Sequence, residues 1–183
     1  PGDVLILTKP IGTGTLFAAH ARLEAKGRWI DDALQSMRHS NRLAAECLRR
    51  FGATACTDLT GFGLLGHLVE MTRPSGVDAT IYLSALPVLE GAENTVGAGI
   101  LSSLQPANVR LRRAIRKVET MVNHPRYPLV FDPQTSGGLL ASMAADHADA
   151  CVRELISLGY SQTRIIGAIH PKGDSPEPIT LLH

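Results

Sequence analysis

The chain has 183 residues, of which 44% are hydrophobic and 19% are charged. This composition is globular and excludes disorder, collagen and coiled coil as descriptions of the whole chain. Its 18 Lys and Arg residues nearly balance 17 Asp and Glu residues, for a net charge of +1, and aromatic residues make up only 4%. Without a basic block or a set of stacking side chains, no nucleic-acid partner is expected.

The cysteines indicate the compartment. The chain has three cysteines, which are Cys47, Cys56 and Cys151. Their number is odd, they are widely spaced, and none forms a Cys-x-x-Cys pair. The sequence therefore predicts neither a disulfide framework nor a zinc site. It predicts a reducing, cytoplasmic compartment.

No apolar run approaches the roughly 20 residues that span a bilayer, so no membrane partner is expected. The chain opens at Pro1 without a Met, which suggests a fragment of a longer protein.

The first part of the chain alternates between strand and helix patterns. Residues 4–7 are a continuous apolar run that predicts a buried strand, and residues 15–26 predict a helix closed by Gly27. A second, longer helix is predicted over 31–51. Asn41 falls on its apolar stripe, so its amide is expected either to make structural hydrogen bonds or to face a site.

The other predicted elements are a strand at 53–57, a glycine-rich helix at 61–71, a strand at 78–83, a helix at 109–119, a strand at 139–143, a helix at 146–158 and a strand at 165–169. The five basic residues of the helix at 109–119 are expected to form a solvated face. The tail from Pro171 contains three prolines and is expected to be poorly ordered. The elements predict one α+β domain over 1–170, a mixed β-sheet layered with α-helices, followed by a poorly ordered tail over 171–183.

The strongest candidate for chemistry runs from Cys56 to His67. A strand brings Asp58 to its end, and a helix is predicted to begin about two residues later, so the positive end of the helix dipole favours an anion there. A carboxylate beside a phosphate site is the usual arrangement for Mg²⁺. The alternative is that Asp58 and Thr60 cap the helix and the following glycines permit tight packing.

Two further segments are turns rich in glycine. Residues 8–14 follow a strand and precede a helix, as a phosphate loop does, but no Gly-Lys-Ser/Thr occurs at Walker A spacing. A strand-to-helix turn is therefore the favoured interpretation. Residues 132–138 form a polar turn between apolar runs, for which a structural loop is favoured when the segment is taken alone.

The histidine and cysteine of the strongest segment receive ordinary interpretations. His67 either lines the same cleft as Asp58 or lies on the surface of its helix, and the surface position is favoured. No histidine shows metal-binding spacing. Cys56 has no local base, so a small buried core thiol is expected. Because side chains two apart on a strand share a face, the Asp58 carboxylate is expected to raise the pKa of the Cys56 thiol.

Taken together, these segments resemble selenophosphate synthetase (selenide, water dikinase). The matching residues occur in family order and are Leu7-Thr8-Lys9-Pro10 with Gly12 and Gly14, Met37 with Ser40-Asn41, Ala55 to His67, and Asp132 to Gly138. The strings Thr-Asp-x-Thr-Gly-Phe-Gly and Asp-Pro-Gln-Thr-Ser-Gly-Gly are specific in combination. The resemblance covers residues from about 2 to 170 and implies the C-terminal lobe of the aminoimidazole-ribonucleotide-synthetase-like fold.

The resemblance also implies a reaction and a site. The family converts ATP, selenide and water to selenophosphate, phosphate and AMP, and Asp58 matches an aspartate that helps hold Mg²⁺ bridging the ATP phosphates. The other matched residues of the expected cleft are Lys9, Gly12, Gly14, Asn41, Thr60, Gly61, Thr135 and Ser136. No catalytic residue is assigned within this chain, because the family's Cys or selenocysteine, lysine and paired aspartates belong to the N-terminal lobe.

The resemblance implies further features of the longer protein, called the parent below. It is expected to be a homodimer held largely through the other lobe, and some family members carry a fused flavin-dependent oxidoreductase-like domain. This chain alone is expected to be inactive. The alternative is a non-catalytic module of the same fold that binds a nucleotide or a protein partner, and the two specific strings disfavour a different synthetase of the superfamily.

Overall fold

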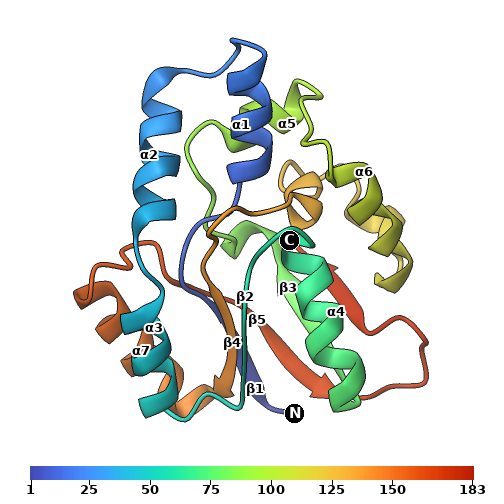
Figure 1. The fold of residues 1–183 in the computed structure, drawn as a ribbon. Helices are drawn as coiled ribbons and strands as arrows, with labels where there is room; N and C mark the ends of the chain where they lie inside the picture. Colours follow the sequence, from blue (N-terminus) through green and yellow to red (C-terminus); the bar gives the residue numbers. More distant parts are fainter.

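A mixed sheet of six strands runs through the computed structural model, which describes residues 1–183 (Figure 1). The strands are β1 (Asp3–Leu7), β2 (Ala55–Asp58), β3 (Val77–Tyr82), β4 (Leu139–Ala144), β5 (Arg164–Pro171) and β6 (Ile179–Leu182). Their order is β2-β4-β1-β5-β3-β6, and all neighbours are antiparallel except β3 and β6, which are parallel. The predicted α+β class with a mixed sheet is therefore confirmed.

Helices pack on the sheet and extend beyond one end of it (Figure 1). They are α1 (Thr13–Ala21), α2 (Gly27–Arg38), α3 (Arg42–Arg50), α4 (Gly63–Ser75), α5 (Ala92–Gly97), α6 (Gln105–Asn108) and α7 (Ala145–Ser157). Short 3-10 turns span Leu83–Ala85, Val109–Ala114, Val118–Thr120 and Pro128–Phe131. None of the helices combines the length and the apolar character that crossing a bilayer requires.

The alternation of side chains along β1 divides the core between the two faces of the sheet. Leu5 and Leu7 belong to a cluster of 30 buried hydrophobic residues, which also contains the buried side of α4. Ile6 points to the opposite face, into a cluster of 11 residues shared with α3 and α7. A strand covered on both faces needs apolar residues at every position, which explains the continuous apolar run at 4–7.

The single helix predicted at 31–51 is wrong, because the chain breaks it into α2 and α3. The carbonyl of His39 accepts a hydrogen bond from Lys9 Nζ at 2.5 Å, and the carbonyl of Ser40 accepts one from Tyr160 Oη at 2.6 Å. These donors satisfy backbone groups that a continuous helix would have satisfied internally. The break therefore depends on partners that are distant in the sequence.

Two other predicted helices differ from the structure. α1 ends at Ala21, and Gly27 begins α2 instead of closing a helix. The helix predicted at 109–119 is wrong, because a 3-10 turn is followed there by residues that pair with β6. The Arg116 amide donates to the carbonyl of Ile179 at 2.8 Å. Pairing with a strand holds the backbone extended and prevents the α-helical pattern.

The structure also differs from the expectation of a poorly ordered tail at 171–183. β6 pairs in parallel with β3, from Ala79 opposite Ile179 to Tyr82 opposite Leu182. Ile179 is fully buried and belongs to the larger core cluster. Burial of this apolar strand stabilises the pairing despite the prolines that precede it. The sheet therefore continues past residue 170.

Candidate functional site

Three segments that are far apart in the sequence meet at one end of the sheet. β4 runs antiparallel to both β1 and β2, with Leu140 opposite Leu7 and Leu139 opposite Asp58. The ends of β1 and β2 and the start of β4 therefore lie at the same end of the sheet. The segments that extend from this end of the sheet are residues 8–14, 58–61 and 132–138.

Backbone hydrogen bonds join the segment 132–138 to the turn that follows β2. The Leu59 amide donates to the carbonyl of Gly138 at 2.9 Å, and the Gln134 amide donates to the carbonyl of Thr60 at 2.9 Å. Each segment thus satisfies backbone groups of the other, as buried loops require. The segment 132–138 therefore supports the turn after Asp58 at Leu59 and at Thr60.

The same segment caps the start of α1. Gln134 Oε1 accepts from the amides of Gly12 and Thr13 at 3.0 and 3.3 Å. Asp132 Oδ2 accepts from the Gly14 amide at 3.1 Å. Side chains of the protein therefore occupy the amide groups that a phosphate loop would offer to a ligand. This geometry fits the strand-to-helix turn that the sequence favoured for residues 8–14.

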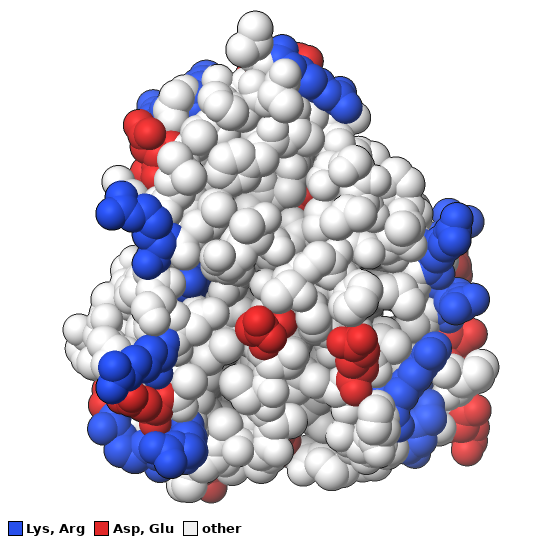
Figure 2. Space-filling model, viewed as in Figure 1, with Lys and Arg blue, Asp and Glu red and all other residues white.

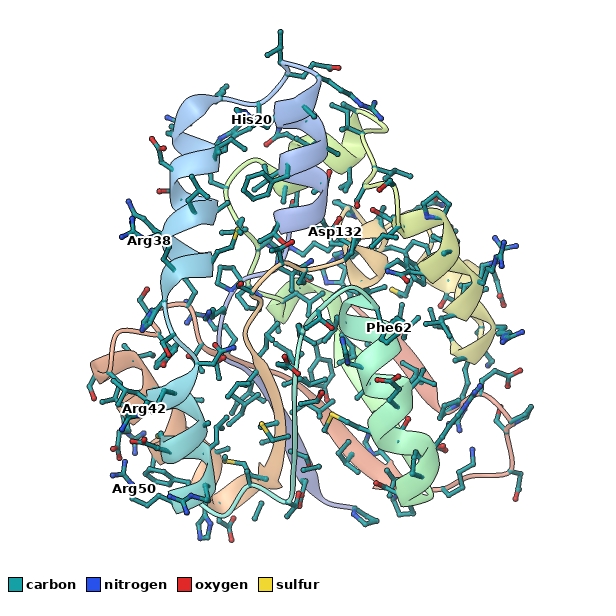
Figure 3. All side chains as sticks on the ribbon, in the orientation of Figure 1. His20, Arg38, Arg42, Arg50, Phe62 and Asp132 are labelled. Atoms are coloured by element: carbon teal, nitrogen blue, oxygen red, sulfur yellow. The ribbon has the colours of Figure 1, made fainter.

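Asp132 lies fully buried between the start of α1 and the start of α4 (Figure 3). Burial raises the pKa of its carboxyl group to about 7, while hydrogen bonds from Gln134 and Gly14 oppose the rise. A Cβ atom at Gly14 would lie 2.6 Å from both Asp132 Oδ1 and the carbonyl of Pro133. Sequence patterns marked the turn cluster 132–138 but gave no separate role to Asp132.

The carboxylate of Asp58 stands free at the end of β2. Its side chain is exposed, and the first turn of α4 has Phe62 at its N-cap position and no side-chain cap. Thr60 directs its hydroxyl to His67 instead, at 3.0 Å. The alternative in which Asp58 and Thr60 cap the helix is therefore wrong. A carboxylate with no structural task at this position remains available to a cation.

The start of α4 is less open than the sequence indicated. The helix begins at Gly63, whose amide donates to the carbonyl of Thr60 at 3.1 Å. Gly63 and Leu64 are buried, and a Cβ atom at Gly63 would lie 3.0 Å from the backbone of Phe131. This end of the helix packs under another segment and does not present its amides to an anion. The open groups nearby are Asp58 and the exposed ring of Phe62 (Figure 3).

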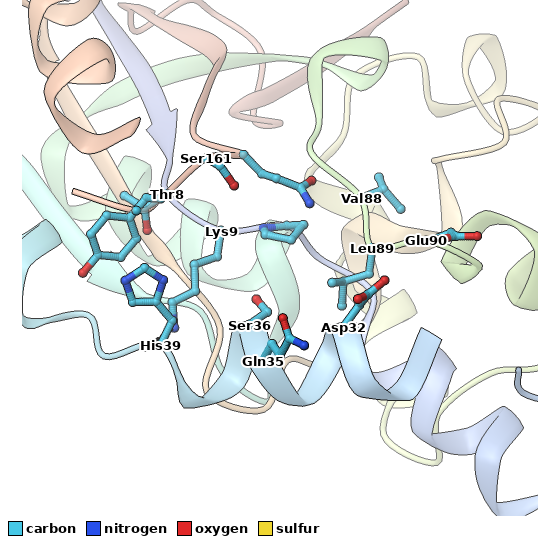
Figure 4. Close-up of a pocket in the computed structure, with 14 residues that line it drawn as sticks. Thr8, Lys9, Asp32, Gln35, Ser36, His39, Val88, Leu89, Glu90 and Ser161 are labelled. Atoms are coloured by element: carbon cyan, nitrogen blue, oxygen red, sulfur yellow. Dashed lines mark hydrogen bonds between the residues drawn. The ribbon is translucent and has the colours of Figure 1, made fainter. Parts of the chain in front are cut away.

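Lys9 forms a cross-link within the chain. Its side chain is directed toward His39 in the pocket of Figure 4, and its Nζ donates to the carbonyls of His39 and Ser136 at 2.5 and 3.3 Å. Lys9 is only 4% exposed, and burial lowers the pKa of its ammonium group. Two of its three donors are thus used inside the protein, so Lys9 orients the segment 132–138 rather than standing free for a ligand.

Asn41 supports the next residue of the same segment. Its Nδ2 donates to the carbonyl of Gly137 at 2.9 Å, while its Oδ1 is buried without a hydrogen-bond partner. Of the two roles left open by the sequence, the structure shows the structural one.

Two interpretations of the strongest segment are wrong. His67 is not a surface residue: it is 6% exposed, and its Nε2 accepts from the Thr60 amide at 3.1 Å. Cys56 is not a buried core thiol: it is exposed on the edge strand β2. Partial desolvation and the charge of Asp58 both raise the pKa of the Cys56 thiol, as the shared strand face predicted.

The candidate residues divide between two pockets. A pocket of about 650 Å³ contains Lys9 and His39 (Figure 4). A second pocket of about 590 Å³ lies beside α1 and is lined by Gly14, Gly61 and Thr135. Neither pocket includes the Asp58 side chain. The expected cleft residues therefore surround the end of the sheet without converging on one cavity of this chain.

The remaining candidates have separate surroundings. Gly12 is buried with φ +126°, and a Cβ atom there would lie 2.4 Å from Cβ of Ala92 on α5. Ser136 is exposed with a positive φ of 49°. Its carbonyl accepts from Lys9 Nζ, and the carbonyl of the next residue, Gly137, accepts from Asn41 Nδ2. Thr135 is exposed, and its amide donates to Thr13 Oγ1 at 2.9 Å.

On the face shown in Figure 2, charged side chains do not form a continuous basic surface. The Lys and Arg side chains lie mainly around the margin of that face, at its top and along both flanks, and isolated acidic groups stand nearer its middle. Arg110, Arg112, Arg113 and Lys117 are exposed, as predicted for the segment 109–119. Arg116 differs, because it forms an ion pair with the buried carboxylate of Asp78.

The residues present fit Mg²⁺ through a single ligand. No group of three or more His, Cys, Asp or Glu side chains in this chain is arranged to hold a metal ion. Mg²⁺ needs only one or two carboxylates when phosphate oxygens and water complete its shell. The exposed Asp58 carboxylate meets that requirement.

Comparison with known proteins gives a family model and a set of curated relatives. The model described as "AIR synthase related protein, C-terminal domain" matches residues 1–175. Selenide, water dikinase 2 of Peptoclostridium acidaminophilum is 37% identical over 172 residues, which cover 94% of this chain and 49% of the relative. The selenide, water dikinase of Desulfitobacterium hafniense (strain DSM 10664 / DCB-2) is 40% identical over 177 residues, which cover 96% and 51%. The chain thus spans about half the length of the curated relatives it matches.

Solved structures share the fold. HypE of E. coli superposes with a TM-score of 0.70 and 20% identity, over 100% of this chain and 47% of that one. Thiamine monophosphate kinase of Aquifex aeolicus gives a TM-score of 0.56 and 16% identity, over 98% and 50%. At these identities the likeness concerns the fold alone.

Proposed function

The chain belongs to the family of AIR synthase related proteins, as their C-terminal domain, and we propose that it forms half of a selenide, water dikinase. The parent would convert ATP, selenide and water to selenophosphate, phosphate and AMP. Support comes from relatives that carry this name and align with almost the whole chain. The three cysteines are free in the structure, which suits the proposed reducing, cytoplasmic compartment.

One observation carries the proposal for the site: the Asp58 carboxylate is exposed at the end of β2 and has no capping role. We assign it as a ligand of Mg²⁺ in the cleft between this domain and the other half of the parent. When bound, Mg²⁺ supplies charge neutralisation to the ATP phosphates. The segment 132–138 supports the turn after Asp58, so the backbone that carries this carboxylate is held in place before ATP arrives.

The other cleft residues act mainly through positioning. Lys9 and Asn41 hold the backbone at Ser136 and Gly137, and Thr60 joins its turn to His67. Such contacts orient the segment that faces the other half of the parent. We assign the reacting side chains to that other half, so this chain by itself is expected to have no dikinase activity.

The substitution Asp58→Asn in the parent tests this proposal. Asn keeps the size of the side chain but removes the charge that Mg²⁺ requires. Loss of a residue that only supports a metal ligand costs up to about 100-fold, so loss of the ligand itself should lower selenide-dependent AMP formation by more than about 100-fold. Asp146→Asn, on the exposed start of α7, is the matched control and should leave turnover unchanged. Near-normal turnover of the Asp58 variant at limiting Mg²⁺ would exclude the ligand role.

The assay of the unaltered parent separates the enzyme from its alternative. A parent that binds nucleotide but forms no AMP with selenide would be a non-catalytic module of the same fold. We also propose a homodimeric parent held largely through the other half, with a fused oxidoreductase-like domain as a variant of that architecture. Light scattering of the parent and of this chain alone tests the homodimer: the parent should be dimeric and the isolated chain monomeric.

A further inference from the structure

We propose that His67 is a positioning residue that fixes the turn after Asp58 in the geometry needed to bind Mg²⁺. This inference rests on the proposed function, because it concerns the same carboxylate. His67 lies within α4 and reaches back seven residues to Thr60. It contributes no ligand and touches no substrate in this assignment; it acts through the backbone of the turn.

The contact is buried and specific. His67 is 6% exposed, and its Nε2 lies 3.1 Å from the Thr60 amide nitrogen and 3.0 Å from Thr60 Oγ1. The ring of Phe62 packs beside the imidazole, with 5.7 Å between ring centroids. The imidazole of His67, on α4, therefore packs against the turn that precedes this helix.

The hydrogen-bond partners determine the tautomer of His67. A backbone amide can only donate, so the Nε2 that receives the Thr60 amide must be unprotonated, and the ring proton lies on Nδ1. Nδ1 is 3.3 Å from Glu70 Oε2, one turn further along α4. This carboxylate favours a proton on Nδ1 and thereby keeps Nε2 available as an acceptor. Nδ1 is buried and makes no hydrogen bond, so the Glu70 carboxylate acts on it through its charge alone.

The bond between His67 and Thr60 bears on Asp58 because each residue of the turn from Asp58 to Thr60 is held. Asp58 pairs with Leu139 in the sheet, and Leu59 is fully buried with its amide bonded to Gly138. Thr60 is held by His67 through its amide and by Gln134 through its carbonyl. Loss of the imidazole would leave the Thr60 amide without an acceptor and release the support on the α4 side. The Asp58 carboxylate would then sample more positions and bind the cation less well.

Two substitutions in the parent separate positioning from mere stability. His67→Ala removes the acceptor, and the free Mg²⁺ concentration for half-maximal turnover should rise about tenfold, as for other outer-shell partners. In His67→Gln the amide Oε1 can accept from the Thr60 amide, and the Mg²⁺ requirement should return to within about twofold of the unaltered parent. His20→Gln, on the exposed end of α1, is the control and should change nothing.

The outcomes distinguish the proposal from a structural role. A His67→Ala parent that melts earlier but keeps its Mg²⁺ dependence would overturn the proposal, as would a folded His67→Gln parent with the defect of the alanine variant. If the alanine variant does not fold, His67→Leu takes its place, because leucine fills much of the same space but offers no acceptor to the Thr60 amide. Positioning then predicts the tenfold rise in the Mg²⁺ requirement, and a purely structural role predicts no change.

A second measurement does not depend on activity. In the ¹⁵N NMR spectrum of the parent labelled at histidine, His67 should show an unprotonated Nε2 and a protonated Nδ1, with assignment from the spectrum of His67→Gln. The Thr60 amide should exchange with solvent at least about tenfold faster in His67→Ala. The opposite tautomer would overturn the inference even in an active enzyme. Failure of the proposed function would appear differently, as a parent with the expected tautomer but no selenide-dependent AMP.

Discussion

Asp132 is a carboxyl group with no exposed surface, and its burial couples stability to pH. Burial raises its pKa from 3.8 to about 7 against the opposing hydrogen bonds from Gln134 and Gly14. Between these two values the folded chain keeps a proton that the unfolded chain releases. The contribution of Asp132 to the free energy of unfolding therefore falls as pH rises from about 4 to about 7, and it is constant above that range.

Asp132→Asn tests this coupling, because the amide does not titrate. In the unaltered chain, the Asp132 contribution should fall by up to about 4 kcal/mol across this pH range. The variant should lack that part of the slope. Urea unfolding at several pH values between 4 and 8 measures the difference between the two proteins. Identical slopes would show that Asp132 titrates near its ordinary value, and Asp146→Asn serves as an exposed control.

Cys56 lies beside Asp58 but has the wrong environment for a nucleophile. Its thiol is exposed, and partial desolvation together with the Asp58 charge raises its pKa, which lowers the thiolate fraction. Cys56→Ser in the parent should therefore keep most of the selenide-dependent turnover at saturating ATP. Because the side chain is exposed, the free energy of unfolding should change by no more than about 0.5 kcal/mol. A folded variant whose turnover falls by orders of magnitude would make Cys56 a catalytic candidate.

The start of α1 depends on a glycine beneath a loop from another part of the chain. A Cβ atom at Gly14 would stand 2.6 Å from both Asp132 Oδ1 and the carbonyl of Pro133, so any side chain there forces these groups apart. The loop cannot yield easily, because Gln134 and Asp132 also cap the helix. Close packing at this point thus links the position of α1 to that of the segment 132–138.

Gly14→Ala should lower the free energy of unfolding by about 3 kcal/mol through overpacking. Gly27→Ala is the matched control, because Gly27 begins α2 with no heavy atom within 4 Å of its added Cβ. The control should be neutral or stabilising by up to about 1 kcal/mol. Chemical denaturation of both variants provides the comparison. Equal effects would show that the loop moves aside without cost.

Asp78 connects three parts of the molecule that are remote in sequence. Its carboxylate pairs with Arg116, accepts from Lys172 Nζ at 3.0 Å and accepts from the Gly173 amide at 2.9 Å. Burial by itself raises the pKa of Asp78, but these donors lower it to about 2. Because the folded pKa lies below the unfolded one, the stabilisation is present above about pH 4 and is lost as pH falls toward 2.

Asp78→Asn should lower the free energy of unfolding at pH 7 by about 3 kcal/mol, because Arg116 then loses its buried partner. The loss should be largest where Asp78 holds the chain before β6, so amide exchange in β6 should accelerate most. Asp174→Asn, exposed on the same loop, is the control and should be near neutral. Unfolding measurements combined with hydrogen exchange test both effects. Unchanged protection of β6 would contradict the connecting role.

Local patterns in the sequence determined most of the elements and the class of the fold. Apolar runs at 4–7, 139–143 and 165–169 correspond to β1, β4 and β5, and the helical pattern at 146–158 corresponds to α7. These elements bury a regular stripe or face, which a window of a few residues records. The turn cluster at 132–138 was also visible, because Gly and Pro mark turns directly.

Only the tertiary structure decided the features that depend on distant partners. The break between α2 and α3 relies on Lys9, 30 residues from His39, and on Tyr160, 120 residues from Ser40. Likewise, β6 forms because it can pair with β3, which is distant in the sequence. Cys56 is exposed because β2 is an edge strand of the sheet. A local pattern encodes which side chains prefer burial, but hydrogen-bond partners and sheet order arise only when remote segments come together.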